Sequence, residues 1–221
     1  MWASQAVASG LQVSPVTLTL PGNENAGGLW LSNQGDNPVN AQVRVYHWEQ
    51  SNFADRLNAS QGLVVSPPML TLAPGERQLI RIIRVGPASK SVEDAYRLSI
   101  DELPPSRLQS NKLQFVLHYS VPIFIQPASM PPTSLKLQWS LKSIGRDTFV
   151  DVSNQGNSHA QISAVTYISP KGARKVITPG LLGYVLPGST MRWILPLSDN
   201  NISRGSKLEV TINGQKTLQD L

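Results

Sequence analysis

The sequence predicts an all-β fold, and three features of its pattern support this prediction. Short apolar segments such as "NAQVRVYHW" from Asn40 alternate apolar and polar residues with a period of two, which is typical of half-buried strands. Turn-forming residues separate these segments about every 8–12 residues. In the first half of the chain, no segment keeps the 3.6-residue apolar period of a helix.

Two turn motifs recur in the same order along the chain. The turn Ser32–Gly35 ("SNQG") returns as Ser153–Gly156, and "LAPGERQLIRI" from Leu72 is echoed by "VLPGSTMRWIL" from Val185. Such echoes indicate two copies of one structural plan. Because short strands separated by turns are typical of an immunoglobulin-like sandwich, the sequence predicts two immunoglobulin-like β-sandwich domains. The SNQG motif is then the turn between the second and third strands of each.

A proline-rich segment separates the two copies. "QPASMPPTS" contains three prolines and is expected to form a short, stiff connector. The predicted boundaries are an N-terminal domain at residues 11–126, a linker at 127–133 and a C-terminal domain at 134–221. Residues 1–10 are interpreted as a signal-peptide remnant or a disordered tail, because Ala6-Val7-Ala8 has signal-peptidase spacing without a long apolar core before it.

Seven strands are predicted in the first domain. In the first, "LQVSPVTLTL", the apolar alternation changes phase at Pro15, so this strand is expected to kink and pass from one sheet to the other. "GLWLSN" and "NAQVRVYHW" follow, and Pro74-Gly75 divides "GLVVSPPMLTLAPGERQLIRIIRV" into two more strands. "AYRLSIDELP" and "KLQFVLHYSVPIFIQP" complete the set.

The second domain restarts the same pattern after the connector. Its predicted strands are "LKLQWSL", "TFVDVSNQG", "AQISAVTYI", "GLLGYVL", "STMRWILPL" and "KLEVTING".

Composition excludes several classes of site. The chain of 221 residues has no cysteine, which rules out disulfides, Cys-ligated zinc, iron–sulfur clusters and thiol catalysis. Its formal net charge is +5, but Lys and Arg are scattered, which favours a solubilising surface over a nucleic-acid-binding face. No apolar run approaches the ~20 residues of a membrane span.

No catalytic or metal-binding motif is found. His47, His118 and His159 do not occur at metal-ligand spacing. Asp101 and Glu102 are adjacent, so in a strand they face opposite sides and cannot act as a carboxylate pair. Nucleophile-elbow, P-loop and dinucleotide motifs are missing. The sequence therefore predicts no enzyme, no metal and no cofactor.

The last strand of the first domain has an unusually long apolar face. Alternate residues of this face are all apolar or aromatic: Leu113, Phe115, Leu117, Tyr119, Val121, Ile123 and Ile125. One interpretation is a strand buried by both sheets or by the neighbouring domain. The other is β-augmentation, in which the strand adds to a partner's sheet and alternate side chains fill the partner's pockets.

The free energy gained when this strand adds to a partner's sheet would be large. Three large side chains moved out of water contribute roughly 1.5–3 kcal/mol each. About six ladder hydrogen bonds add roughly 0.5–1.5 kcal/mol apiece before ordering costs. A partner lacking a strand of its own would be held firmly.

Three segments together resemble a known family. "SPPMLTLAPGERQLIRI", "YRLSIDELPP" and "KLQFVLHYSVPIFIQP" are similar to the first domain of the periplasmic pilus chaperones, the PapD-like family. The resemblance runs from about Val13 to the end of the chain. It implies two immunoglobulin-like domains in a boomerang arrangement, located in the periplasm. It also implies that the seventh strand is lent to pilin subunits until an outer-membrane usher exchanges it.

The resemblance also implies particular site residues. Matching on "PIFIQP" places Leu113, Phe115 and Leu117 at the donor positions, with Tyr119 next on the same face. The interval after "DELPP" is short, as in the short-loop type of the family.

The anchor for the subunit's C-terminal carboxylate departs from the family pattern. Its usual basic positions correspond to Thr17 and Pro122, which resembles the archaic branch. Arg97 is therefore predicted to be the cationic anchor, with possible support from Arg81, Arg84 and His118.

Two functions remain open at this point. The first is a chaperone whose partners are pilin subunits and the usher, with no nucleic acid and no membrane span. The alternative is a structural or adhesive two-domain β-sandwich protein of the cell surface without chaperone activity. Whether the free protein covers its apolar strand by self-association is also left open.

Overall fold

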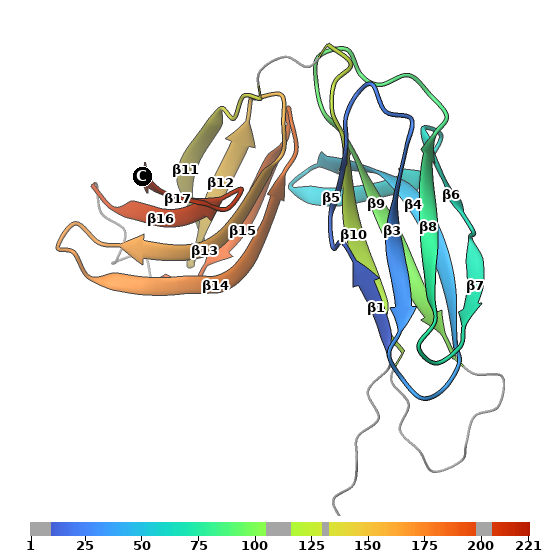
Figure 1. Cartoon of the computed structure of the whole chain (residues 1–221). Coiled ribbons are helices and arrows are strands. Elements are labelled where there is room, and N and C mark those ends of the chain that lie inside the picture. The colour runs from blue at the N-terminus through green and yellow to red at the C-terminus, as the bar shows by residue number, and fades with distance from the viewer. Residues whose placement is uncertain (1–9, 105–115, 130–132, 198–204) are drawn as a thin grey trace, which may run out of the picture. The chain divides into compact units, whose positions relative to one another are not determined.

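The computed structural model describes residues 10–104, 116–129, 133–197 and 205–221, and every regular element in these ranges is a strand (Figure 1). The all-β prediction is therefore confirmed for this part of the chain. None of it forms a helix of the length and apolarity needed to cross a membrane.

The chain forms two compact units. The first comprises the described residues up to Trp48 together with Leu57–Lys90 and Asp94–Ser129. The second comprises the described residues after Met130 together with Glu49–Arg56 and Ser91–Glu93.

The first unit is a sandwich of two sheets, each named here after one of its strands. The β8 sheet has the order β1 (Leu11–Ser14), β3 (Ala26–Asn33), β8 (Arg77–Arg84), β6 (Leu63–Ser66). The β10 sheet has the order β2 (Leu18–Leu20), β10 (His118–Ile125), β9 (Asp94–Leu103), β4 (Val39–Ser51), β5 (Ala54–Ala59), and β7 (Met69–Leu72) also pairs with β4.

Prolines divide two of the predicted strands between these sheets. The expected kink at Pro15 is confirmed, since β1 pairs with β3 and β2 pairs with β10. The prediction of one strand across "GLVVSPPMLTL" is wrong, because it splits at Pro67-Pro68 into β6 on β8 and β7 on β4. Proline has no N–H to donate, so two in succession interrupt a ladder and let the chain change sheets. Strand β5 was not predicted.

The inward faces of the two sheets form one apolar core. In the β10 sheet, one face of β9 and β10 contributes Tyr96, Leu98, Ile100, Val121, Ile123 and Ile125. The β8 sheet contributes Leu11, Leu29, Leu31, Ile80, Ile82 and Leu63. Alternate residues of the same strands therefore face away from the core.

The second unit repeats the sandwich plan with two other sheets. One has the order β11 (Leu137–Ile144), β12 (Asp147–Asn154), β15 (Thr190–Leu195). The other has the order β14 (Arg174–Val185), β13 (Ala160–Ile168), β16 (Lys207–Ile212), β17 (Gln215–Asp220). Their inward residues form a second core that includes Val150, Val152, Ile162, Tyr167, Val185, Leu208 and Val210.

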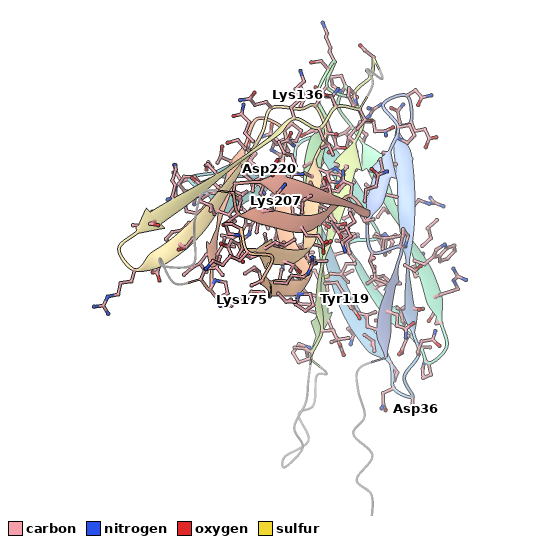
Figure 2. The ribbon with its side chains drawn as sticks, turned by 90° about the vertical axis from the view of Figure 1, so that its left-hand side faces the viewer. Asp36, Tyr119, Lys136, Lys175, Lys207 and Asp220 are labelled. Atoms are coloured by element: carbon pink, nitrogen blue, oxygen red, sulfur yellow. The ribbon has the colours of Figure 1, made fainter. Side chains whose placement is uncertain are left out.

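The final strand was missed from sequence. Asn213 and Gly214 have φ values of 48° and 82°, as the central pair of a tight hairpin turn requires. After this turn the chain runs back along β16 as β17. Lys207 of β16 and Asp220 of β17 form an ion pair at 2.9 Å (Figure 2).

The recurring SNQG motif places one buried asparagine in each unit. Asn33 Nδ2 donates to the carbonyls of Asn37 and Leu72 at 2.8 and 3.0 Å, and its Oδ1 accepts from the Gly35 N–H at 3.0 Å. Because it satisfies three main-chain groups at once, this side chain holds the turn against a neighbouring strand.

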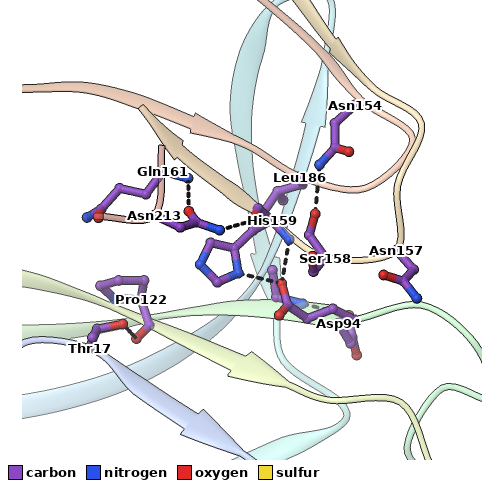
Figure 3. A network of polar contacts seen from close by, with 12 residues as sticks. Thr17, Asp94, Pro122, Asn154, Asn157, Ser158, His159, Gln161, Leu186 and Asn213 are labelled. Atoms are coloured by element: carbon purple, nitrogen blue, oxygen red, sulfur yellow. Dashed lines mark hydrogen bonds and ion pairs between the residues drawn. The ribbon is translucent and has the colours of Figure 1, made fainter. Parts of the chain in front are cut away.

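Asn154 makes the equivalent bonds in the second unit. Its Nδ2 donates to Ser158 and Val185 at 2.8 and 3.0 Å, and its Oδ1 accepts from Gly156 at 2.9 Å; Figure 3 shows the bond to Ser158. SNQG is confirmed as the connection from β3 to β4 and from β12 to β13. These are the second and third strands of each unit, if β1 and β2 are counted as one strand in the first unit.

The two recurring motifs contact each other in both units. Gly75 of the first Pro-Gly turn donates its N–H to the Asn33 carbonyl at 2.8 Å, and Gly188 donates to the Asn154 carbonyl at 2.8 Å. The echoes in sequence thus correspond to one repeated contact between two turns.

Candidate functional site

Strand β10 is paired unequally on its two edges. One edge pairs with β9 along the whole of His118–Ile125. The other edge pairs with β2, but only over Ile123–Ile125. Among the described residues, no strand pairs with this second edge from His118 to Pro122. An edge of this kind can accept a strand from another chain.

Burial changes along the same strand. Val116 is 50% exposed, and His118 and Ser120 are also exposed. From Val121 to Ile125 every residue is buried. The burial interpretation of this strand therefore applies to its second half, while its first half is open on one face and along one edge.

The predicted donor residues fall partly outside the structure. Leu113 and Phe115 lie outside the described residues. Leu117 packs against the core, and Tyr119 packs against it too, with its hydroxyl donating to the Leu11 carbonyl at 2.7 Å. The donor roles of these four residues stay predictions.

A glutamate of β9 is bonded twice to Leu117, the residue that precedes β10. The N–H of Glu102 donates to the Leu117 carbonyl at 2.9 Å. In return the Leu117 N–H donates to the Glu102 side chain, at 3.0 Å from Oε2. Within the described residues β10 begins at His118, and the predicted start of this strand at Lys112 lies outside them.

The two positions matched to the family's anchor lie side by side. The Thr17 hydroxyl donates to the Pro122 carbonyl at 3.5 Å (Figure 3). Arg97 lies directly opposite Pro122 on β9, and Tyr46 lies opposite Arg97 on β4. The structure thus brings the predicted anchor, Arg97, next to both Pro122 and Tyr46 in the β10 sheet.

Arg97 is stacked on a buried aromatic ring. Its guanidinium carbon lies 3.7 Å from the centroid of the Trp48 ring. The rings of Trp48 and Phe124 are 6.1 Å apart, and the two residues are 2% and 1% exposed. Neither belongs to the apolar core, because both face the outer side of the β10 sheet. Trp48 was not among the predicted site residues, although the alternation of Arg44, Tyr46 and Trp48 places all three on one face of a strand.

The two arginines predicted to support the anchor, Arg81 and Arg84, do not lie near Arg97. Arg81 is on β8, opposite Gly28 and Ser66 in the β8 sheet. Arg84, on the same strand, donates from Nη2 to Asn25 Oδ1 at 2.6 Å. Because both belong to the other sheet, the structure does not bring them to the row of Pro122.

His118 belongs to a charged cluster farther along the strand. Its Nδ1 lies 2.6 Å from Asp101 Oδ1, and Asp101 Oδ2 accepts from Arg44 at 2.7 Å and from Ser99 at 2.9 Å. Burial acts to raise the pKa of Asp101, but the hydrogen bonds from Arg44, His118 and Ser99 outweigh it and hold the pKa below its usual value. His118 lies four residues from Pro122, about 13 Å along the strand.

The other two histidines also pair with one carboxylate each. His47 Nε2 lies 2.8 Å from Asp94 Oδ1, and His159 Nδ1 lies 2.7 Å from Glu93 Oε1. Within the part of the chain that the structure describes, no group of three or more His, Cys, Asp or Glu side chains is arranged to hold a metal ion.

Comparisons with known proteins point to one family. The family model described as "Pili and flagellar-assembly chaperone, PapD N-terminal domain" matches residues 10–131. A curated relative, the chaperone protein PmfD of Proteus mirabilis strain HI4320, is 27% identical over 135 residues. That match covers 59% of this chain and 51% of the relative, so the chain spans about half the length of the curated relative it matches.

Solved structures of chaperones share the fold over nearly the whole chain. The CsuC–CsuE chaperone–tip subunit complex of archaic Csu pili from Acinetobacter baumannii matches with 24% identity and a TM-score of 0.75, covering 94% of this chain and 96% of that one. The Salmonella enterica SafA pilin–SafB chaperone complex matches with 18% identity and a TM-score of 0.68, covering 99% of each chain. The prediction of two immunoglobulin-like domains is confirmed by this likeness.

Proposed function

Because this chain belongs to the family of pili and flagellar-assembly chaperones, we propose that it binds pilin subunits in the periplasm and delivers them to an outer-membrane usher. It acts by binding, through the open edge of β10 and the apolar residues that precede it. We place it in the archaic branch, since Thr17 and Pro122 cannot bind a carboxylate by charge.

The unequal pairing of β10 carries this proposal. A strand with one free edge and an alternating apolar face supplies the two ingredients of β-augmentation, main-chain hydrogen bonds and side chains for alternate pockets. The residues whose second edge is unpaired, His118–Pro122, follow directly on Leu113, Phe115 and Leu117 in sequence. A pilin that lacks its last strand has the complementary gap.

Co-expression with a pilin subunit tests the proposal. The double variant Leu113→Asp plus Phe115→Asp should reduce subunit recovery by tenfold or more, on the order of the free energy lost when large side chains cannot be buried. Leu218→Asp is the matched control, since Leu218 is 49% exposed on β17 and should leave recovery unchanged. Unchanged recovery with the double variant would favour the structural or adhesive sandwich instead.

Arg97 is proposed as the anchor for the subunit's C-terminal carboxylate. A charge-assisted hydrogen bond contributes about 1.5–3 kcal/mol, so Arg97→Ala should weaken subunit retention by roughly ten- to a hundredfold. The thermal midpoint of the free chaperone should change little. Arg77→Ala is the control, because Arg77 is stacked on Trp30 in the β8 sheet. A large fall in the midpoint of Arg97→Ala would mark a structural arginine.

A further inference from the structure

We propose that Trp48 is a positioning residue that holds the Arg97 guanidinium in the geometry needed to bind a main-chain carboxylate. This inference rests on the proposed role of Arg97 as the anchor. The two residues come from neighbouring strands, β4 and β9, and both face the outer side of the β10 sheet.

The contact has the geometry of a strong cation–π interaction. The 3.7 Å separation between the guanidinium carbon and the ring centroid is well inside the ~6 Å range of this interaction, and tryptophan is the most favourable ring for it. Trp48 is 2% exposed, so the ring is withdrawn from water and the attraction is less screened.

The ring itself is held in place by packing across a small residue. Ala95 lies opposite Phe124 in the register of β9 and β10, and it is 4% exposed. Its single methyl group leaves space for the rings of Trp48 and Phe124 to approach to 6.1 Å at an interplanar angle of 42°. A side chain fixed in this way provides a stable surface for the arginine.

Stacking suits a carboxylate anchor for a chemical reason. The ring engages the face of the guanidinium, whereas a carboxylate is bound by N–H groups in the guanidinium plane. Trp48 can therefore restrict the long arginine side chain without competing for the donors that bind the ligand. A lysine at this position would keep the charge but lose the planar face.

The first unit contains a matched pair for comparison. Arg77 lies over the Trp30 ring at 4.0 Å, but this pair belongs to the β8 sheet and Trp30 is 40% exposed. Both pairs are Trp–Arg stacks between neighbouring strands of the same unit. Only the Trp48–Arg97 pair lies in the sheet that contains β10.

A double-mutant cycle tests the proposal with a pilin subunit co-expressed with the chain, reading subunit retention and its dissociation rate. Trp48→Leu should speed dissociation about three- to tenfold, as expected for loss of a desolvated cation–π contact. Trp48→Phe, which keeps a ring, should have a smaller effect. Trp30→Leu should have none. In the Arg97→Ala background, Trp48→Leu should cause no further change.

The outcomes distinguish failure of the chaperone function, of the Arg97 anchor and of the Trp48 contact. If wild-type protein retains no subunit, the proposed function fails. If it retains subunit but Arg97→Ala does as well, the anchor role fails. If Trp48→Leu is equally damaging with and without Arg97, Trp48 has only a structural role and the present inference is overturned.

A second readout holds even where Trp48→Leu folds poorly. A subunit extended by one C-terminal glycine presents its carboxylate in the wrong place, so Trp48→Phe should weaken retention of the native subunit and leave that of the extended subunit unchanged. In the Arg97→Lys background, Trp48→Phe should not change retention of the native subunit, because the lysine ammonium lacks the planar face. Equal weakening of both subunits by Trp48→Phe would contradict a positioning role.

Discussion

Strand β10 of the first unit and strand β17 of the second are both last strands with an incompletely paired edge, yet they differ in side-chain composition. The open half of β10 continues an apolar alternation, and its inward residues reach the core. In β17, by contrast, Lys216 pairs with Glu209 and Asp220 pairs with Lys207 on the neighbouring strand, and most of its side chains are exposed.

This difference shows how one sandwich plan serves two purposes. Charged side chains on a short edge strand discourage pairing with another chain, and β17 is of this kind. An apolar strand with a free edge invites such pairing. The two units share their turn chemistry and their core pattern, so the composition of the last strand is what distinguishes a closed sandwich from one proposed to lend a strand.

The largest expected effect concerns the feature that the units share. Asn33→Ala and Asn154→Ala each leave three main-chain groups without their side-chain partner, and at least one of the three is buried in each unit. Each substitution should therefore cost its own unit about 2–4 kcal/mol of unfolding free energy. Amide hydrogen exchange in the core strands of each unit would measure the two losses separately. A loss shared equally by both units would contradict the expectation of independent turns.

Gln155→Ala supplies the control for this pair. Gln155 is in the same turn, but its side chain is exposed and donates to Gln138 only at 3.3 Å. Its removal should change the unfolding free energy by less than about 0.5 kcal/mol.

A smaller difference in stability is expected between the two units when the aspartate of their charged clusters, Asp101 or Asp151, is replaced. Asp151 accepts hydrogen bonds from Arg192 at 2.6 and 2.8 Å and pairs with Lys142, and its side chain is 6% exposed, against 24% for Asp101. The Arg192 hydrogen bonds, assisted by Lys142, hold the pKa of Asp151 below its ordinary value of 3.8 despite burial. At neutral pH, Asp151→Asn should lower the free energy of unfolding by about 2–3 kcal/mol. Asp101→Asn should lower it by about 0.5–1 kcal/mol.

The pH dependence has a defined sign for both carboxyl groups. A pKa that is lower in the folded than in the unfolded state contributes stability at neutral pH and loses it as the pH falls below the unfolded value, about 4, through the lowered folded value. The difference between wild type and Asp151→Asn should therefore shrink as the pH is lowered from 4 to 2. Denaturant unfolding across this range would reveal a constant difference if the ion pairs contribute nothing.

The smallest effect concerns backbone strain in β13. Ala164 has a φ of 50°, a conformation that costs alanine about 1 kcal/mol, at an irregularity in the pairing of β13 with β14. Ala164→Gly relieves this strain but adds chain entropy, so the net change should lie within about 0.5 kcal/mol of zero. As a control, Ala26→Gly in the regular strand β3 should lower the free energy of unfolding by about 1 kcal/mol. Equal losses of unfolding free energy at the two positions would argue against strain at Ala164.

Much of the fold could be predicted because its determinants are local. The phase change at Pro15, the turn at Pro74-Gly75 and the SNQG motif each express a backbone preference of a few residues, and all three have the predicted place. The Asn213-Gly214 pair is an equally local turn signal, and it predicts the hairpin between β16 and β17. The split at Pro67-Pro68 was missed because both halves keep an apolar strand pattern, and only their partners differ.

The candidate site was predictable only in part, because some of its features are local in sequence and others depend on which strands pair. Alternation identified the apolar face of β10, and family resemblance identified Arg97 as the cation near Pro122. The separation of Arg81 and Arg84 from Arg97 depends on which strand pairs with which, and no nearby residue encodes that. The stacking of Arg97 on Trp48 likewise joins strands distant in sequence.

By itself, the amino-acid sequence determined two β-sandwiches, the position of their turns and an apolar last strand in the first of them, because period-two alternation and the chemistry of Asn, Gly and Pro act over a few residues. Tertiary structure alone decided that part of β10 keeps a free edge, that the Glu102 side chain accepts from the Leu117 N–H, and that Arg97 is stacked on Trp48. These features arise from the order and register of strands, which depend on how the whole core packs and not on any one segment.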